Sequence, residues 1–191
     1  MGLLGDFLAD AAEWAEGRWW LPRLPLLGYL AYVGWRHLRE PEEYSSLLFG
    51  GVTFGVHELG HLIFSPLGEL MGIAGGSLTQ LLAPVLAGAV FLFWQREGEP
   101  QRDYFGVALA ACWLAFSCWN LATYVGDAKH QDLPLLGLSA DPIHDWAYLL
   151  GRFGLVDHCL RFAGLIRLAA FGIWAAAIAF GGWLLLRMAR S

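Results

Sequence analysis

Long apolar stretches separated by short polar segments dominate the pattern of hydrophobic and polar positions along this chain. Five of these stretches approach the roughly 20 apolar residues that an α-helix needs to cross a lipid bilayer. The pattern therefore predicts spanning helices at residues 21–35, 45–65, 78–94, 104–124 and 165–188. We expect an all-α chain that folds as a polytopic membrane helix bundle.

Two further segments are amphipathic rather than continuously apolar. In residues 3–20, Leu, Phe, Ala and Trp alternate with Asp and Glu at roughly helical spacing. This favours an interfacial helix with Trp14, Trp19 and Trp20 at the level of the lipid headgroups. An amphipathic helix that packs on the rest of the protein fits this segment equally well. The second amphipathic stretch covers residues 144–158.

Together these segments predict one integral membrane domain. Its expected parts are an interfacial helix at 1–20, a four-helix core at 21–128, a loop and amphipathic helix at 129–160, and the last transmembrane helix at 165–188. The glycine-rich segment 68–77 is nearly free of charge, which predicts a loop that stays within or against the membrane. It would be either a re-entrant segment beside the site or a short turn at the surface.

Composition agrees with a membrane location and excludes some classes of function. The 191 residues are 57% hydrophobic and 15% charged, whereas an average soluble domain has about 25% charged residues. The net charge of -5 leaves no basic surface for nucleic acid. Three scattered cysteines are too few for a disulfide framework or a cysteine-based metal site. We expect a multi-pass protein of the inner or cell membrane, surrounded by a lipid bilayer, with no nucleic-acid partner.

The stretch from His57 to His61 carries the candidate chemistry. Its H-E-x-x-H spacing places both imidazoles on one face of a helix, where they can bind one metal ion with Glu58 beside it. The motif also occurs by chance in helices that bind nothing. Within an apolar span, however, ionisable groups are costly unless they pair, bind an ion or line a wet cavity. We interpret the motif as a zinc site, with His57 and His61 as ligands and Glu58 as the general base.

Catalytic zinc usually takes a third protein ligand. Asp127 ends the fourth predicted span and lies on one helix face with Asn120, seven residues earlier, if the helix continues through both. Asp127 would otherwise only terminate that helix. His144 and Asp145 are an adjacent histidine and carboxylate that could complete the metal shell or orient a ligand, although the helix dipole alone also favours Asp145. The residues leave Asp127, His144 and Asp145 as open candidates.

These motifs resemble the site-2 protease family of intramembrane zinc metalloproteases. The likeness covers roughly residues 54–128, with H-E-L-G-H inside a predicted span and an Asn-Leu pair at Asn120 two helices later. The family has an Asn-x-x-Pro-x-x-x-Leu-Asp-Gly element, in which Asp is the third zinc ligand and Asn helps to hold the scissile peptide. The resemblance implies a zinc cofactor, Asp127 as third ligand and Asn120 as a substrate-binding residue. In this chain the Asn-to-Asp spacing is one residue shorter, Thr123 stands in place of Pro, and Gly126 precedes the Asp.

The favoured function is an intramembrane zinc metalloendopeptidase that hydrolyses a membrane protein or peptide substrate in or near the bilayer. Gln80, Asn120 and Thr123 are candidates to line the polar cavity that supplies water. The alternative is a non-hydrolytic metal-binding membrane protein or an inactive protease-like partner. A membrane di-iron hydroxylase would need clustered histidines, and of the 6 in this chain only His57 and His61 are close in sequence.

Overall fold

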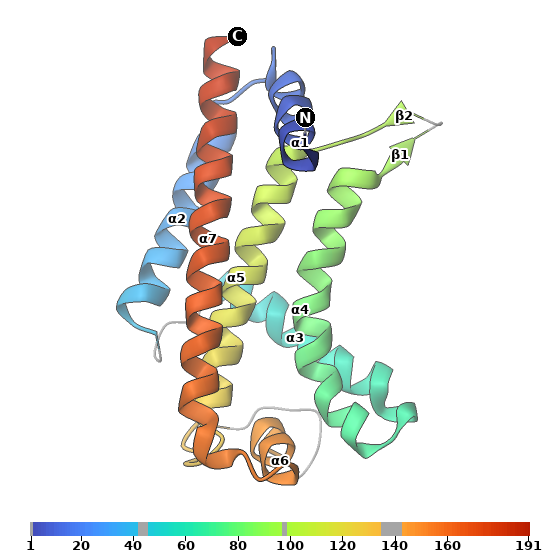
Figure 1. Ribbon diagram of the computed structural model, residues 1–191, viewed down its shortest axis with the longest axis vertical. Helices are drawn as coiled ribbons and strands as arrows, with labels where there is room; N and C mark the ends of the chain where they lie inside the picture. Colours follow the sequence, from blue (N-terminus) through green and yellow to red (C-terminus); the bar gives the residue numbers. More distant parts are fainter. Residues whose placement is uncertain (1, 42–45, 97–98, 135–142) are drawn as a thin grey trace.

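Helices form nearly all of the structure, as Figure 1 shows. The structure is a computed structural model that describes residues 2–41, 46–96, 99–134 and 143–191. In this described part the helices are α1 (Leu3–Ala15), α2 (Arg23–Arg39), α3 (Leu47–Phe64), α4 (Glu69–Phe93), α5 (Tyr104–Gly126), α6 (Asp145–Arg152) and α7 (Cys159–Arg190). Two 3-10 turns, η1 (Ser65–Leu67) and η2 (Val156–His158), and one short antiparallel pair, β1 (Gln95–Arg96) and β2 (Glu99–Pro100), complete it. The prediction of an all-α chain is confirmed.

Four helical segments among the described residues are long and apolar enough to cross a membrane. They are Leu47–Leu67, Glu69–Phe93, Tyr104–Gly126 and Val156–Arg190. The remaining predicted span, residues 21–35, forms α2, which has only 17 residues. Its last turn carries Arg36, His37 and Arg39, and these polar side chains shorten its apolar part. Four candidate spans are therefore seen where the apolar pattern predicts five.

The long helices differ in their direction. In Figure 1, α2, α4, α5 and α7 run side by side along the long axis, whereas α3 lies obliquely near the end at which α6 is found. α5 is the innermost of the candidate spans, because 67% of its apolar window is buried. The metal motif therefore lies toward one end of the bundle, on the helix that departs most from the common direction.

A stripe of small residues on α7 packs against α5. Ala163, Ala170 and Ala177 recur every seventh residue and are almost fully buried, and the larger Leu184, also buried, continues this spacing. Small side chains at a helix interface let two backbones approach closely, which is the usual source of packing energy between helices in a membrane. This packing fixes α5, the helix that lies next to the site.

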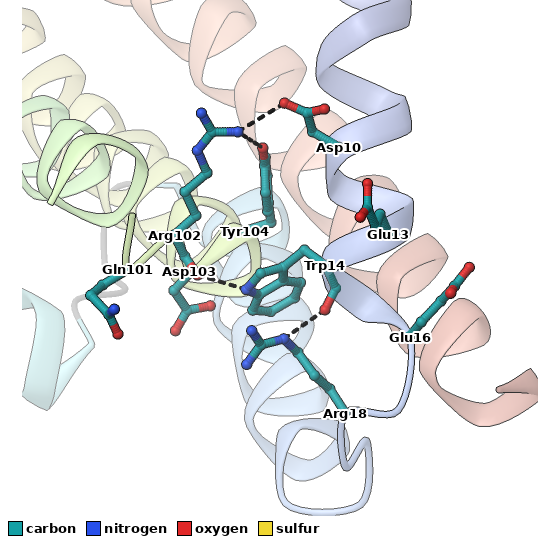
Figure 2. Close-up of a pocket in the computed structure, with 9 residues that line it drawn as sticks. All are labelled: Asp10, Glu13, Trp14, Glu16, Arg18, Gln101, Arg102, Asp103 and Tyr104. Atoms are coloured by element: carbon teal, nitrogen blue, oxygen red, sulfur yellow. Dashed lines mark hydrogen bonds and ion pairs between the residues drawn. The ribbon is translucent and has the colours of Figure 1, made fainter. Parts of the chain in front are cut away.

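α1 packs on the rest of the protein at the end opposite α6 (Figure 1). Figure 2 shows Arg102 bridging to Asp10 of α1, with an N···O distance of 2.8 Å. The Trp14 indole nitrogen donates to the Arg102 carbonyl oxygen at 2.6 Å, and Ala11 is fully buried. Trp14 is thus engaged by protein, while Trp19 is 68% exposed.

The predicted loop at residues 68–77 is wrong. Apart from Gly68, the segment is helical and forms the first turns of α4. Gly75 and Gly76 are buried there, so these glycines serve close helix packing rather than a change of chain direction. The first turns of α4 therefore pack against the metal motif, in a segment for which the sequence pattern predicts irregular backbone.

Candidate metal centre

α3 presents its two histidines together. The helix begins after Ser46, whose hydroxyl accepts a hydrogen bond from the Phe49 amide and so caps the first turn. Because His57 and His61 are one helical turn apart, their rings lie edge to face with centroids 4.7 Å apart. This arrangement is the one that H-E-x-x-H spacing predicts.

Glycines let α4 pack directly against the metal motif. A Cβ atom on Gly75 would lie 2.6 Å from the carbonyl oxygen of Gly60 on α3. A Cβ atom on Gly76 would lie 2.6 Å from Nε2 of His61 and 2.7 Å from Nε2 of His57. The α4 backbone is therefore one wall of the site, and any larger residue at position 76 would displace both imidazoles.

α6 brings a carboxylate to the two imidazoles. Oδ2 of Asp145 lies 3.1 Å from His57 Nε2 and 3.3 Å from His61 Nε2, and the two Nε2 atoms are 3.0 Å apart. Among the described residues, these three form the group whose ligand types and spacing could hold a metal ion. The side chains of His57, His61 and Asp145 are 12%, 27% and 7% exposed, so the group is largely enclosed and is most open at His61.

The first turn of α6 is attached to both neighbouring helices. The backbone N–H of Asp145 donates to the Tyr124 hydroxyl of α5 at 3.0 Å. The Trp146 indole nitrogen donates to the Ser77 hydroxyl of α4 at 3.1 Å. These two bonds flank the Asp145 side chain, and they explain why a short helix can place a carboxylate so closely against α3.

Hydrogen bonds at Nδ1 determine which nitrogen of each imidazole is available to a metal. His61 Nδ1 lies 2.8 Å from the carbonyl oxygen of Gly72, which can only accept, so Nδ1 carries the proton. His57 Nδ1 lies 2.9 Å from Oε1 of Gln80. The amide nitrogen of Gln80 donates to the Ser117 carbonyl oxygen at 2.9 Å, which fixes the amide orientation and makes Oε1 the acceptor from His57. In the neutral form of both imidazoles, Nε2 therefore carries the lone pair, and both Nε2 atoms point toward Asp145.

Three lone-pair atoms that converge in this way need a cation between them. Their separations of 3.0, 3.1 and 3.3 Å are close to the spacing of about 3.3 Å between nitrogen or oxygen ligands of tetrahedral zinc. Neutral imidazoles with Nδ1 bound to a carbonyl oxygen are also the form in which histidine binds metals. The donor set thus fits a divalent metal, and without a metal a shared proton would have to replace it.

Asp145 stays ionised in this setting. Burial raises the pKa of its carboxyl, but without a metal the proton shared with His57 and His61 lowers the pKa by more, through hydrogen bonding and charge, so the net shift is downward. A carboxylate rather than a carboxylic acid therefore faces the two imidazoles near neutral pH, which is the state that a metal ligand requires.

Asp127 and His144 lie together, outside the group of three. Asp127 accepts hydrogen bonds from the backbone N–H groups of Asp132 and Leu133 at 2.9 and 3.1 Å. His144 Nδ1 accepts from the Ala147 amide, so its Nε2 carries the proton that faces Asp127 Oδ2 at 3.3 Å. The pair connects the end of α5 to the start of α6, one residue before Asp145.

Glu58 and Asn120 lie close to the centre without belonging to it. Among the described residues, no hydrogen bond or ion pair holds the Glu58 carboxylate, although it interacts electrostatically with His61 and Tyr124. Asn120 is an exposed residue of α5, and its Oδ1 accepts a weak hydrogen bond from Gln80 at 3.4 Å. Through Gln80, Asn120 is one side chain removed from His57.

Sequence reasoning missed several residues that shape this centre. Gln80 was expected to line a cavity, whereas in the structure it is 2% exposed and orients His57. The only sequence signal for this role is an amide inside an apolar span. The sequence pattern places Gly72 and Gly76 in a loop, and it gives Tyr124 no signal beyond its closeness to Asp127.

Comparisons with known proteins do not assign a family to this chain. No protein-family model, curated protein or solved structure matches it. The observations describe a helical protein with four candidate membrane spans and a largely buried His-His-Asp group.

Proposed function

We propose that this protein is an intramembrane zinc metalloendopeptidase. In this proposal His57, His61 and Asp145 hold the zinc ion, and Glu58 is the general base. The observation that carries it is the convergence of three lone-pair atoms within 3.3 Å of one another, beside a carboxylate with no hydrogen bond or ion pair to any described residue. Two imidazoles and one carboxylate are ligands typical of zinc hydrolases, whose fourth position stays open for water or substrate.

Different residues have different roles in the proposed peptide hydrolysis. When bound, zinc supplies an acidified water and polarises the scissile carbonyl. Glu58 accepts the proton of the attacking water and passes it to the leaving amine nitrogen. The C–O bond to the carbonyl carbon forms first and the peptide C–N bond then breaks, and once both protons of the water have moved to nitrogen the products are a carboxylate and an ammonium group. Gln80 and Gly72 hold the two imidazoles in the orientation that this chemistry needs.

The proposed third ligand differs from the one that the resemblance to site-2 proteases implies. Asp127 already accepts two backbone hydrogen bonds and faces His144, whereas Asp145 faces both zinc-binding imidazoles. We therefore assign the ligand role to Asp145 and keep Asn120 as a residue on the substrate side.

The location of the centre supports a supply of water. α6 lies outside the candidate spans, and α3 lies obliquely toward the same end of the bundle (Figure 1). A site near one end of a membrane bundle needs only a short polar path to water. The proposed substrate is an extended segment of a membrane protein or peptide that reaches this end of the bilayer.

The Glu58→Gln substitution tests this function. Purified protein in lipid vesicles is incubated with fluorogenic membrane-anchored peptides while zinc content is measured. We expect Glu58→Gln to keep its zinc and to lose about 1,000-fold or more in cleavage rate, because a general base contributes about 100- to 10,000-fold. Glu69→Gln, an exposed carboxylate at the start of α4, is the matched control and should cleave normally. Cleavage by Glu58→Gln at the wild-type rate would refute the assignment of the base.

The same ligand set supports a second candidate function. Two histidines and one carboxylate also bind iron(II) in non-haem iron enzymes, so a membrane protein that binds metal without hydrolysing peptides is the alternative. Metal analysis after anaerobic purification separates the two candidates. Stoichiometric zinc with peptide cleavage supports the peptidase, and retained iron without cleavage supports the alternative.

A further inference from the structure

Tyr124 lies beside the metal centre near the end of α5. Its ring packs against the His144 ring, with centroids 4.3 Å apart. It also meets the His57 ring edge to face, with centroids 6.2 Å apart and an interplanar angle of 70°. Contacts on two sides therefore limit the positions that its hydroxyl can take.

Among the described residues, the proton of the Tyr124 hydroxyl has no hydrogen-bond acceptor. Its oxygen accepts the backbone N–H of Asp145 at 3.0 Å. A phenolic hydroxyl can both accept and donate. Among the described residues, no carbonyl, carboxylate or side chain accepts the hydroxyl proton. The hydroxyl is anchored as an acceptor and remains free to donate.

The surroundings of this hydroxyl contain the groups of the proposed reaction. Asp145 is the proposed zinc ligand and Glu58 is the proposed base, and both interact electrostatically with Tyr124. Near neutral pH a tyrosine is a neutral donor. A fixed neutral donor beside a metal-activated carbonyl is the arrangement that stabilises the negative oxygen formed during acyl transfer.

We propose that the Tyr124 hydroxyl donates a hydrogen bond to the scissile carbonyl oxygen as that oxygen becomes negative. The inference rests on the proposed peptidase function and adds a catalytic residue to it. Tyr124 thereby has two roles, because its oxygen positions Asp145 and its proton stabilises the transition state. No proton is transferred from Tyr124, so the residue is unchanged after the turnover.

Kinetics of Tyr124→Phe test the catalytic role. We expect kcat to fall about 100-fold, as for loss of one oxyanion donor, with KM little changed and zinc content equal to that of the wild type, because the Trp146–Ser77 and His144–Asp127 hydrogen bonds still hold the first turn of α6. Tyr32→Phe, which removes an exposed hydroxyl on α2, is the control and should leave kcat and zinc unchanged. An unchanged kcat in Tyr124→Phe would overturn the proposal. Zinc loss in proportion to the loss of rate would also overturn it, because the hydroxyl would then only place Asp145.

A binding measurement tests the same hydrogen bond without peptide cleavage. The cobalt(II)-loaded proteins are titrated with acetohydroxamate, whose oxygen atoms bind the metal and can accept a hydrogen bond from a neighbouring donor. We expect binding about tenfold weaker in Tyr124→Phe than in the wild type and Tyr32→Phe, the scale of one hydrogen bond to a charged group. Equal affinities would overturn the inference. Weaker binding without any peptide cleavage would support the donor role and count against the peptidase function, and failure of the wild type to bind cobalt would overturn both.

Discussion

Two protons and one absent Cβ atom determine whether the histidines of α3 can bind a metal. His57 and His61 each carry a proton on Nδ1, held by Gln80 and by the Gly72 carbonyl oxygen. Both Nε2 atoms then face the space beside Gly76, which has no side chain to fill it. At this scale the centre depends on residues that are not ligands, as is common for metal sites in proteins.

Gly76→Ala should therefore damage the site without damaging the helix. The new Cβ atom would lie 2.6 Å from His61 Nε2, which is too close, so the imidazoles must move apart. We expect zinc affinity to fall at least about tenfold, the lower end of the loss seen when ligand orientation is disturbed. Calorimetric zinc titration measures the change.

Gly88→Ala is the matched control on the same helix. Its Cβ atom would lie 3.6 Å from Ala110, an ordinary contact, and both substitutions favour helix over coil to the same extent. Zinc affinity in Gly88→Ala should equal that of the wild type. Wild-type affinity in Gly76→Ala as well would show that the imidazoles do not bind metal where the structure places them.

At the scale of elements, the position of α6 decides which carboxylate reaches the imidazoles. α6 has only 8 residues, too few to be stable alone in water. Its first turn is held by Tyr124 of α5, by Ser77 of α4 and by the pair of His144 with Asp127. The end of α5 therefore anchors α6, and α6 in turn positions Asp145.

Substitution of the two carboxylates separates these roles. We expect Asp145→Asn to lose bound zinc, because a neutral amide is a poor replacement for a carboxylate ligand. Asp127→Asn should keep most of its zinc, since its amide oxygen can still accept one backbone hydrogen bond. Zinc content after dialysis against a weak chelator provides the measurement. The reverse result, with zinc lost only in Asp127→Asn, would assign the third ligand as the resemblance to site-2 proteases implies.

For the whole molecule, the directions of the helices add information that composition lacks. Length and hydropathy select α3 as a candidate span and pass over α2. In Figure 1, however, α2 follows the same long axis as α4, α5 and α7 while α3 is oblique. The Gly17 amide donates to the Ser191 hydroxyl at 3.0 Å, so the end of α1 and the end of α7 lie at the same end of the bundle.

This arrangement predicts the sides of the membrane on which particular residues lie. If α2, α4, α5 and α7 cross the bilayer, cysteines introduced at Glu16 and Ser191 should react with an impermeant maleimide from the same side. Cysteines introduced at Arg39 and Lys129 should react from the other side. The native cysteines are buried and should stay unlabelled. Labelling of Arg39→Cys from the same side as Glu16→Cys would show that α2 does not cross, whereas labelling of Glu16→Cys and Ser191→Cys from opposite sides would restore the five-span topology.

The sequence alone determined the features that depend on local spacing. Apolar runs predicted five spans, and four of them form helices that are long and apolar enough to cross a membrane, because backbone polar groups in hydrocarbon must be paired within a helix. The spacing of His57, Glu58 and His61 placed two imidazoles on one face, since a helix turns once every 3.6 residues or so. These features require no knowledge of what lies elsewhere in the chain.

The tertiary structure alone decided which residues complete the centre. Asp145 is 88 residues from His57 in the chain, and no local pattern distinguishes it from Asp127, which also lies near a helix end. The choice follows from the packing of α4 against α3 through Gly75 and Gly76 and from the attachment of α6 to Tyr124 and Ser77. Helical periodicity determines the face on which a side chain lies, but only the packing of distant helices determines which side chains meet.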